Sequence, residues 1–112
     1  VRVGCYRRIT EMGKLEEVDE FGRELGDRFG ALPVDVTALL DIARIRILAA
    51  ELGVHSVVVH ETCLVLETPR GLVKGLDRKL PRIRAEKGHA QIREVKQWLS
   101  ERLAQRREYE AE

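Results

Sequence analysis

The chain has 112 residues, enough for one compact domain and too few for two. Hydrophobic residues make up 44% and charged residues 35%, and no apolar run approaches the roughly 20 residues that a membrane span needs. Only Cys5 and Cys63 carry thiols, fewer than a small secreted disulfide scaffold uses. We expect a cytoplasmic domain with no membrane contact. Because Val1 is not an initiator methionine and no secretion signal follows, we expect it to be cut from a longer polypeptide.

The net charge of +1 conceals an uneven distribution of charge along the chain. Residues 1–69 contain 8 basic and 12 acidic side chains, residues 70–107 contain 12 and 4, and residues 108–112 contain 3 acids and no base. The sequence therefore predicts an acidic first half and a strongly basic second half.

The first half has the periodicity of amphipathic helices. Apolar residues three apart predict a short helix over residues 1–11, carried by Val3, Tyr6 and Ile9. Steps of three and four predict a second helix over residues 14–29, with an apolar stripe formed by Leu15, Val18, Phe21, Gly22, Leu25 and Phe29.

Residues 34–52 predict a central helix, because apolar residues cover nearly its whole circumference. We expect it to be the most buried element. Arg46 projects on an apolar side of this helix, where an unpaired guanidinium is costly, so we expect a carboxylate or carbonyl partner for it.

Beyond residue 53 the pattern changes to strands. Residues 54–60 and 62–68 are rich in β-branched side chains and predict a β-hairpin. Helical spacing predicts a short basic helix over residues 72–80, residues 81–86 suggest a third short strand through Ile83, and residues 90–107 predict a final helix. The expected fold is α+β, with four to five helices packed around a small antiparallel sheet of two to three strands in a single domain.

Four carboxylates share the polar face of the helix expected over residues 14–29. At about 100° per residue they fall within about 80° of one another. They are Glu17, Glu20, Glu24 and Asp27. A solvated helix face is a common alternative, but carboxylates this close repel one another unless solvent or a cationic partner compensates them. We therefore interpret this face as a candidate protein interface.

The basic second half is a candidate nucleic-acid contact, because clustered cations bind phosphates by counterion release. The candidate residues are Arg78, Lys79, Arg82 and Arg84. Trp98 is the one aromatic residue of this block, and no helix-turn-helix, zinc-finger or RNA-binding motif is present, so base recognition lacks carriers.

Catalytic and metal chemistry receive little support from the sequence. His60 and Cys63 have a spacing that suits zinc, but a structural site needs about four ligands, and the remaining candidates (His55, His89 and Cys5) fall in different expected elements. No nucleophile motif or glycine-rich phosphate loop occurs. We assign no catalytic, cofactor-binding or metal-binding residue, and expect no enzymatic activity and no cofactor.

Three segments carry a family resemblance. Residues 24–33 (ELGDRFGALP), 39–44 (LLDIAR) and 50–54 (AELGV) closely resemble the C-terminal domain of bacterial transcription-repair coupling factor, the TRCF or Mfd family. The likeness covers nearly all of the chain and is weaker after Thr68.

The resemblance implies a fragment of a multidomain, ATP-dependent DNA translocase that displaces stalled RNA polymerase and recruits UvrA for nucleotide excision repair. It implies that this domain folds back on the UvrA-binding module of the same protein and masks it. Glu24 and Asp27 match family acids that face arginines of that module. The leading hypothesis is therefore an autoinhibitory docking domain, and the alternative is a basic nucleic-acid contact module of the same translocase.

Overall fold

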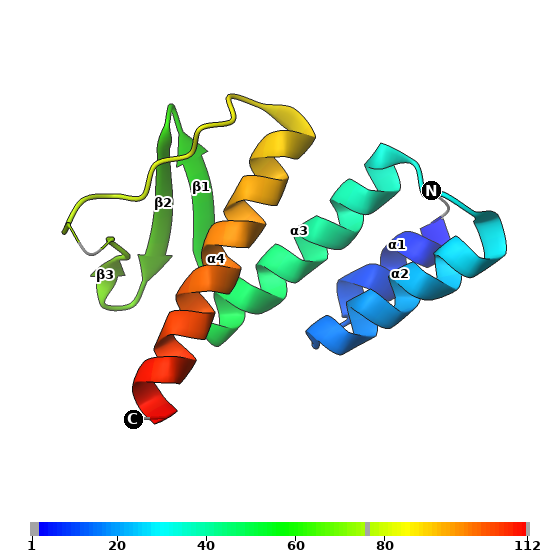
Figure 1. Cartoon of the computed structure of the whole chain (residues 1–112), viewed down its shortest axis with the longest axis horizontal. Helices are drawn as coiled ribbons and strands as arrows, with labels where there is room; N and C mark the ends of the chain where they lie inside the picture. The colour runs from blue at the N-terminus through cyan, green and yellow to red at the C-terminus, as the bar shows by residue number, and fades with distance from the viewer. Residues whose placement is uncertain (1–2, 76, 112) are drawn as a thin grey trace.

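The structure is a computed structural model that describes residues 3–75 and 77–111, and the side chains of residues 7–75 and 77–108. Its elements are α1 (Val3–Glu11), α2 (Leu15–Phe29), α3 (Val34–Glu51), β1 (Ser56–His60), β2 (Cys63–Thr68), β3 (Gly71–Leu72) and α4 (Gly88–Ala111). The strands form one antiparallel sheet in the order β1-β2-β3. Over the described residues, four helices and three strands confirm the expected α+β class (Figure 1). None of these helices is long and apolar enough to cross a membrane.

Helix α3 is the centre of the fold. In Figure 1, α1 and α2 lie on one side of it, and α4 and the sheet lie on the other. Helices α3 and α4 run parallel, because Asp35 pairs with His89 near their starts (3.3 Å) and Glu51 pairs with Arg107 near their ends (3.0 Å). The nearly all-round apolar surface of α3 is what allows it to be covered from both sides.

Two hydrophobic clusters share α3. The first joins α1 and α2 to α3 and is built from Ile9, Met12, Val18, Phe21, Leu40, Ala43 and Ile47. The second joins α3 to the sheet and α4, and is built from Leu48, Ala49, Val54, Leu64, Leu66, Ile83, Val95, Leu99 and Leu103. Seven α3 residues are buried, which confirms α3 as the most buried helix.

The hairpin expected from the β-branched runs is confirmed. Val58 lies opposite Val65 on its outer face, and Val59 lies opposite the fully buried Leu64 on its inner face. The alternation of the side chains gives the sheet one face against α4 and α3 and one exposed face.

The short helix predicted over residues 72–80 is wrong for the described residues, and Leu76 lies outside them. Leu72 belongs to β3 instead. The backbone of Gly75 then bonds to Lys79 in a turn, and Asp77 accepts a hydrogen bond from the Lys79 amide. An Asp side chain that bonds its own backbone competes with helix formation, and Arg78 has a φ of 66° that no helix contains.

The third strand is also not where the sequence placed it. Residues 81–86 form a single bridge between Arg82 and Cys63, and the third strand is Gly71–Leu72. The amide of Ile83 donates to the carbonyl of Thr62, and Ile83 is 2% exposed. Ile83 therefore anchors this segment to the core, but the single bridge between Arg82 and Cys63 is too short to count as a strand.

Two further expectations concern single residues. Arg46 has the predicted carbonyl partners, because its Nη2 donates to the carbonyls of Ile9 (3.2 Å) and Met12 (2.7 Å) at the end of α1. Phe29, expected on the apolar stripe, is 72% exposed. It is the last residue of α2, and the chain turns at Gly30 before α3 can cover it. The side chains of Val3, Cys5 and Tyr6 lie outside the described residues.

Candidate protein-docking surface

Helix α2 separates apolar and acidic side chains as its periodicity predicts. Val18 and Phe21 are buried against α3. The four predicted carboxylates are all exposed on the other side of the helix: Glu17, Glu20, Glu24 and Asp27. The structure therefore brings the four predicted interface residues together on one surface, which we call the acidic face.

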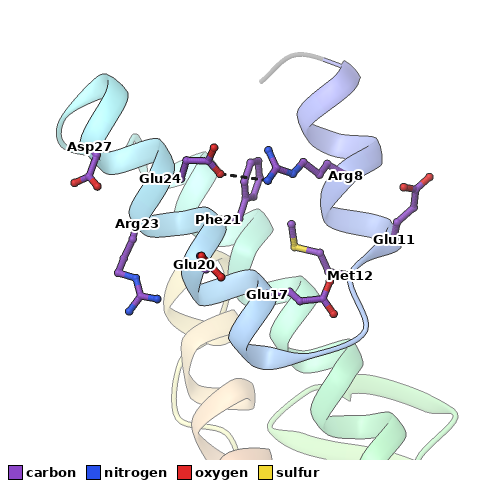
Figure 2. Close-up of a pocket in the computed structure, with 9 residues that line it drawn as sticks. All are labelled: Arg8, Glu11, Met12, Glu17, Glu20, Phe21, Arg23, Glu24 and Asp27. Carbon is purple, nitrogen blue, oxygen red and sulfur yellow. Dashed lines mark hydrogen bonds and ion pairs between the residues drawn. The ribbon is translucent and has the colours of Figure 1, made fainter.

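The acidic face forms one wall of a groove between α1 and α2. Figure 2 shows this groove, which has a volume of about 890 Å³. Its lining contains five carboxylates and two guanidinium groups, with Met12 and Phe21 at its base; the residues are Arg8, Glu11, Met12, Glu17, Glu20, Phe21, Arg23, Glu24 and Asp27. The negative charge and the open shape suit a cationic side chain entering from a partner surface.

One cation of the chain already occupies part of this groove. Arg8 reaches from α1 to Glu24, with 3.2 Å between Nη2 and Oε2, and its Cζ lies 4.5 Å from the centroid of the Phe21 ring (Figure 2). A guanidinium held by a carboxylate and an aromatic face is a standard way of binding arginine. Arg8 therefore shows how an arginine fits this groove, and it also partly neutralises Glu24.

The other three carboxylates of the acidic face, Glu17, Glu20 and Asp27, form no ion pair within the described residues, although Arg23 lines the same groove. In Figure 2, Asp27 and Arg23 point away from α1, whereas Glu24 points toward Arg8. The acidic face thus keeps a net negative charge in the folded chain.

A buried carboxylate holds α2, α3 and α4 in place. Asp41 on α3 is 3% exposed and accepts hydrogen bonds from Arg44 (2.8 Å) and from Lys96 on α4 (3.1 Å). Arg44 also contacts Asp19 on α2, at 2.9 Å. This network fixes the position of α2 and so presents the acidic face on a rigid support.

Sequence reasoning did not find Arg8 or the role of Asp41. Asp41 lies on the polar stripe of α3, and periodicity alone does not show that another helix covers that stripe. The pairing of Arg8 with Glu24 joins residues 16 apart on different helices, for which the sequence contains no local signal.

The candidate nucleic-acid residues lie in the segment between β3 and α4, away from the acidic face (Figure 1). Arg78 and Lys79 belong to the turn after β3, and Arg82 donates to the hydroxyl of Thr62 at 2.7 Å. The amides of Arg84 and Ala85 both donate to the carboxylate of Glu94, and these bonds lower the pKa of Glu94 below its ordinary value of 4.5.

The histidine and cysteine weighed for zinc are cross-strand neighbours in the hairpin, with His60 opposite Cys63. His55 precedes β1 and His89 pairs with Asp35 at the start of α4, so the weighed residues do not converge. Within the described part of the chain, no group of three or more potential metal ligands is present.

The chain is a small α+β domain that exposes an acidic face on one helix. Comparison with known families assigns it further. A family model described as the TRCF domain matches residues 1–72, and the chain belongs to this family.

Curated relatives are transcription-repair-coupling factors. The protein of Rickettsia prowazekii (strain Madrid E) is 39% identical over 56 residues, which cover 50% of this chain and 5% of that protein. The protein of Escherichia coli (strain K12) is 41% identical over 66 residues, which cover 59% of this chain and 6% of that protein. The chain thus spans only a small fraction of the length of these relatives. No solved structure matches it significantly.

Proposed function

We propose that this chain is the C-terminal regulatory domain of a transcription-repair coupling factor, and that its acidic face docks on the UvrA-binding module of the same protein and masks that module. Membership of the TRCF-domain family supports the parentage. The observation that carries the docking role is the exposed acidic face itself, on which Glu17, Glu20 and Asp27 have no ion-pair partner within the described residues.

Electrostatics favour a cationic partner surface. Carboxylates held close together on a rigid helix repel one another, and a partner that carries arginines relieves this repulsion. Glu24 and Asp27 lie about 60° apart around the helix axis and one turn apart along it, so two arginines of one surface can reach both. The network around Asp41 holds α2 before docking, which lowers the entropic cost of binding.

Masking must be reversible for the parent protein to recruit UvrA. The Arg8 and Glu24 pair helps here, because in the undocked domain Arg8 occupies the carboxylate that a partner arginine takes in the docked one. Each exposed ion pair is weak, so the docked and free states differ by only about 1–3 kcal/mol, as is typical of allosteric coupling. The proposed role is non-catalytic, requires no cofactor, and belongs to the cytoplasm, where UvrA and RNA polymerase act.

The docking can be tested with two separate polypeptides. Calorimetry measures the affinity of this chain for the UvrA-binding module of its parent at two salt concentrations. We expect Glu24→Gln with Asp27→Gln to weaken binding about tenfold, because two charge-assisted contacts are lost. Glu61→Gln with Glu67→Gln removes the same charge from the hairpin and serves as the control. Equal affinities for the wild type and the α2 variant would rule out docking through the acidic face.

A further inference from the structure

The segment between β3 and α4 carries a second charged surface. We call residues 77–87 the basic strap. Its five cations are all exposed: Arg78, Lys79, Arg82, Arg84 and Lys87. Within the described residues, none of them takes part in an ion pair. Arg107 and Lys96 on α4, in contrast, are paired with Glu51 and Asp41. Asp77 and Glu86 also belong to the strap, so five cations and two carboxylates give it a net charge of +3, and Glu94 on α4 lies beside Arg84.

The strap is firmly attached although it has no regular secondary structure. The Leu64 amide donates to the carbonyl of Pro81, and the Ile83 amide donates to that of Thr62, both at 2.8 Å. The Glu94 carboxylate accepts hydrogen bonds from the amides of Arg84 (2.7 Å) and Ala85 (2.9 Å). Ile83 enters the second hydrophobic cluster.

Because side chains alternate in an extended chain, the burial of Ile83 directs Arg82 and Arg84 outward. The two arginines are separated by about 6.6 Å along an extended backbone that rises about 3.3 Å per residue. The turn at Arg78 and Lys79 adds two more cations on the same segment. A cluster of exposed cations on a fixed backbone fits a ligand that carries several negative charges close together.

We propose that the basic strap binds the phosphate backbone of nucleic acid. Each strand of a duplex carries one phosphate per about 3.4 Å of helix axis, a dense row of negative charge that several cations of one segment can contact together. The described strap contains no aromatic side chain for base stacking, so binding is independent of sequence and depends strongly on salt. An acidic protein segment is the competing partner, and competition with polyglutamate distinguishes it from nucleic acid in the experiment below.

This inference is independent of the docking proposal. The family model ends at residue 72, before the strap begins. In Figure 1 the strap crosses the sheet side of the molecule, whereas α2 lies on the other side of α3, so the two surfaces can be engaged at the same time.

Fluorescence anisotropy with a labelled 30-base-pair duplex tests the proposal on this chain. The slope of log affinity against log salt concentration changes by about 0.9 for each phosphate contact. We expect Lys79→Gln, Arg82→Gln and Arg84→Gln together to reduce the slope by about 2.7. The control variant, Arg7→Gln, Lys14→Gln and Arg28→Gln, removes the same charge from α1, the loop before α2, and α2. We expect its slope to change by less than about 1.

Circular dichroism checks the folding of each variant. If the triple variant unfolds, Lys79→Gln with Arg84→Gln keeps the Arg82 bond to Thr62, and we expect a reduction of about 1.8. The proposal is overturned if the strap variant keeps the wild-type slope, if the control loses as much as the strap variant, or if polyglutamate competes with the duplex at equal charge concentration. Loss of slope confined to the strap variants, without competition by polyglutamate, supports it.

Discussion

Arg8 lies 3.2 Å from Glu24 across the groove between α1 and α2, so one carboxylate of the acidic face is paired with a cation of its own chain. Both side chains are about half exposed, at 57% and 46%, so the pair adds little to stability, and under the proposed docking it competes with an arginine of the partner surface.

Replacing Arg8 with Ala is expected to strengthen docking, because Glu24 is then available and the acidic face gains one net negative charge. We expect the affinity for the UvrA-binding module to rise several-fold, and the free energy of unfolding to fall by less than about 1.5 kcal/mol through loss of the ion pair and the Phe21 contact. Calorimetry and urea unfolding measure the two effects. Arg7→Ala is the matched control, and a weaker affinity for the Arg8 variant would contradict the competitor role.

Asp41→Ala is expected to destabilise the domain strongly. The substitution leaves Arg44 and Lys96 facing each other without the buried carboxylate that joins them. We expect the free energy of unfolding to fall by about 3 kcal/mol, measured by urea denaturation. Asp35→Ala is the control, because Asp35 is 89% exposed and its loss is expected to cost less than about 0.5 kcal/mol. Similar losses for both variants would show that Asp41 does not brace the three helices.

Removing the Arg46 side chain is expected to loosen α1. Arg46→Met keeps most of the apolar stem but removes two hydrogen bonds to the carbonyls of Ile9 and Met12. We expect a loss of about 1–2 kcal/mol and faster amide exchange in α1 than in α3. Arg23→Met provides the control on α2. Unchanged exchange in α1 would mean that these bonds do not hold the helix.

Glu94 predicts a specific dependence of stability on pH. Its pKa is lower in the folded chain, because the carboxylate accepts the amides of Arg84 and Ala85. The ionised carboxylate of Glu94 therefore stabilises the folded chain fully at pH values above its unfolded pKa of 4.5. This stabilisation is lost as the pH falls through the lower pKa of the folded chain. We expect the wild type to be more stable than Glu94→Gln at pH 7, with the difference shrinking as the pH falls below 4.5.

Thermal unfolding of both proteins across this range measures the effect of Glu94. Glu101→Gln is the control, since the Glu101 side chain accepts its bond from Gln97 one turn away on the same helix. A constant difference between wild type and Glu94→Gln at every pH would show that the strap is not held by the ionised carboxylate.

The elements that the sequence predicted best are those set by local periodicity. The apolar stripe of α2 and the nearly all-round apolar α3 are visible in the sequence, and both helices begin and end within one residue of their expected bounds. The position of Arg46 among apolar neighbours predicted a carboxylate or carbonyl partner, because an unpaired guanidinium there is costly, and the structure supplies two carbonyls.

The failures have a different physical origin. In the segment after β3, helical spacing of leucines was outweighed by the Asp77 turn, by the left-handed backbone of Arg78 and by pairing of the chain with β2. Likewise, the burial of Asp41 depends on α4, which lies about 50 residues further along the chain and brings Lys96 to it. Periodicity shows which face a residue occupies, but not which element covers that face.

The central claim is that the acidic face of α2 masks the UvrA-binding module, and UvrA binding by the full-length parent protein tests it most directly. We expect Glu24→Lys with Asp27→Lys to raise the affinity for UvrA about 5- to 150-fold, the range that corresponds to a coupling of about 1–3 kcal/mol. Glu61→Lys with Glu67→Lys is expected to leave it at the wild-type value. An unchanged affinity in the α2 variant, or an equal rise in the hairpin control, would contradict masking by this face.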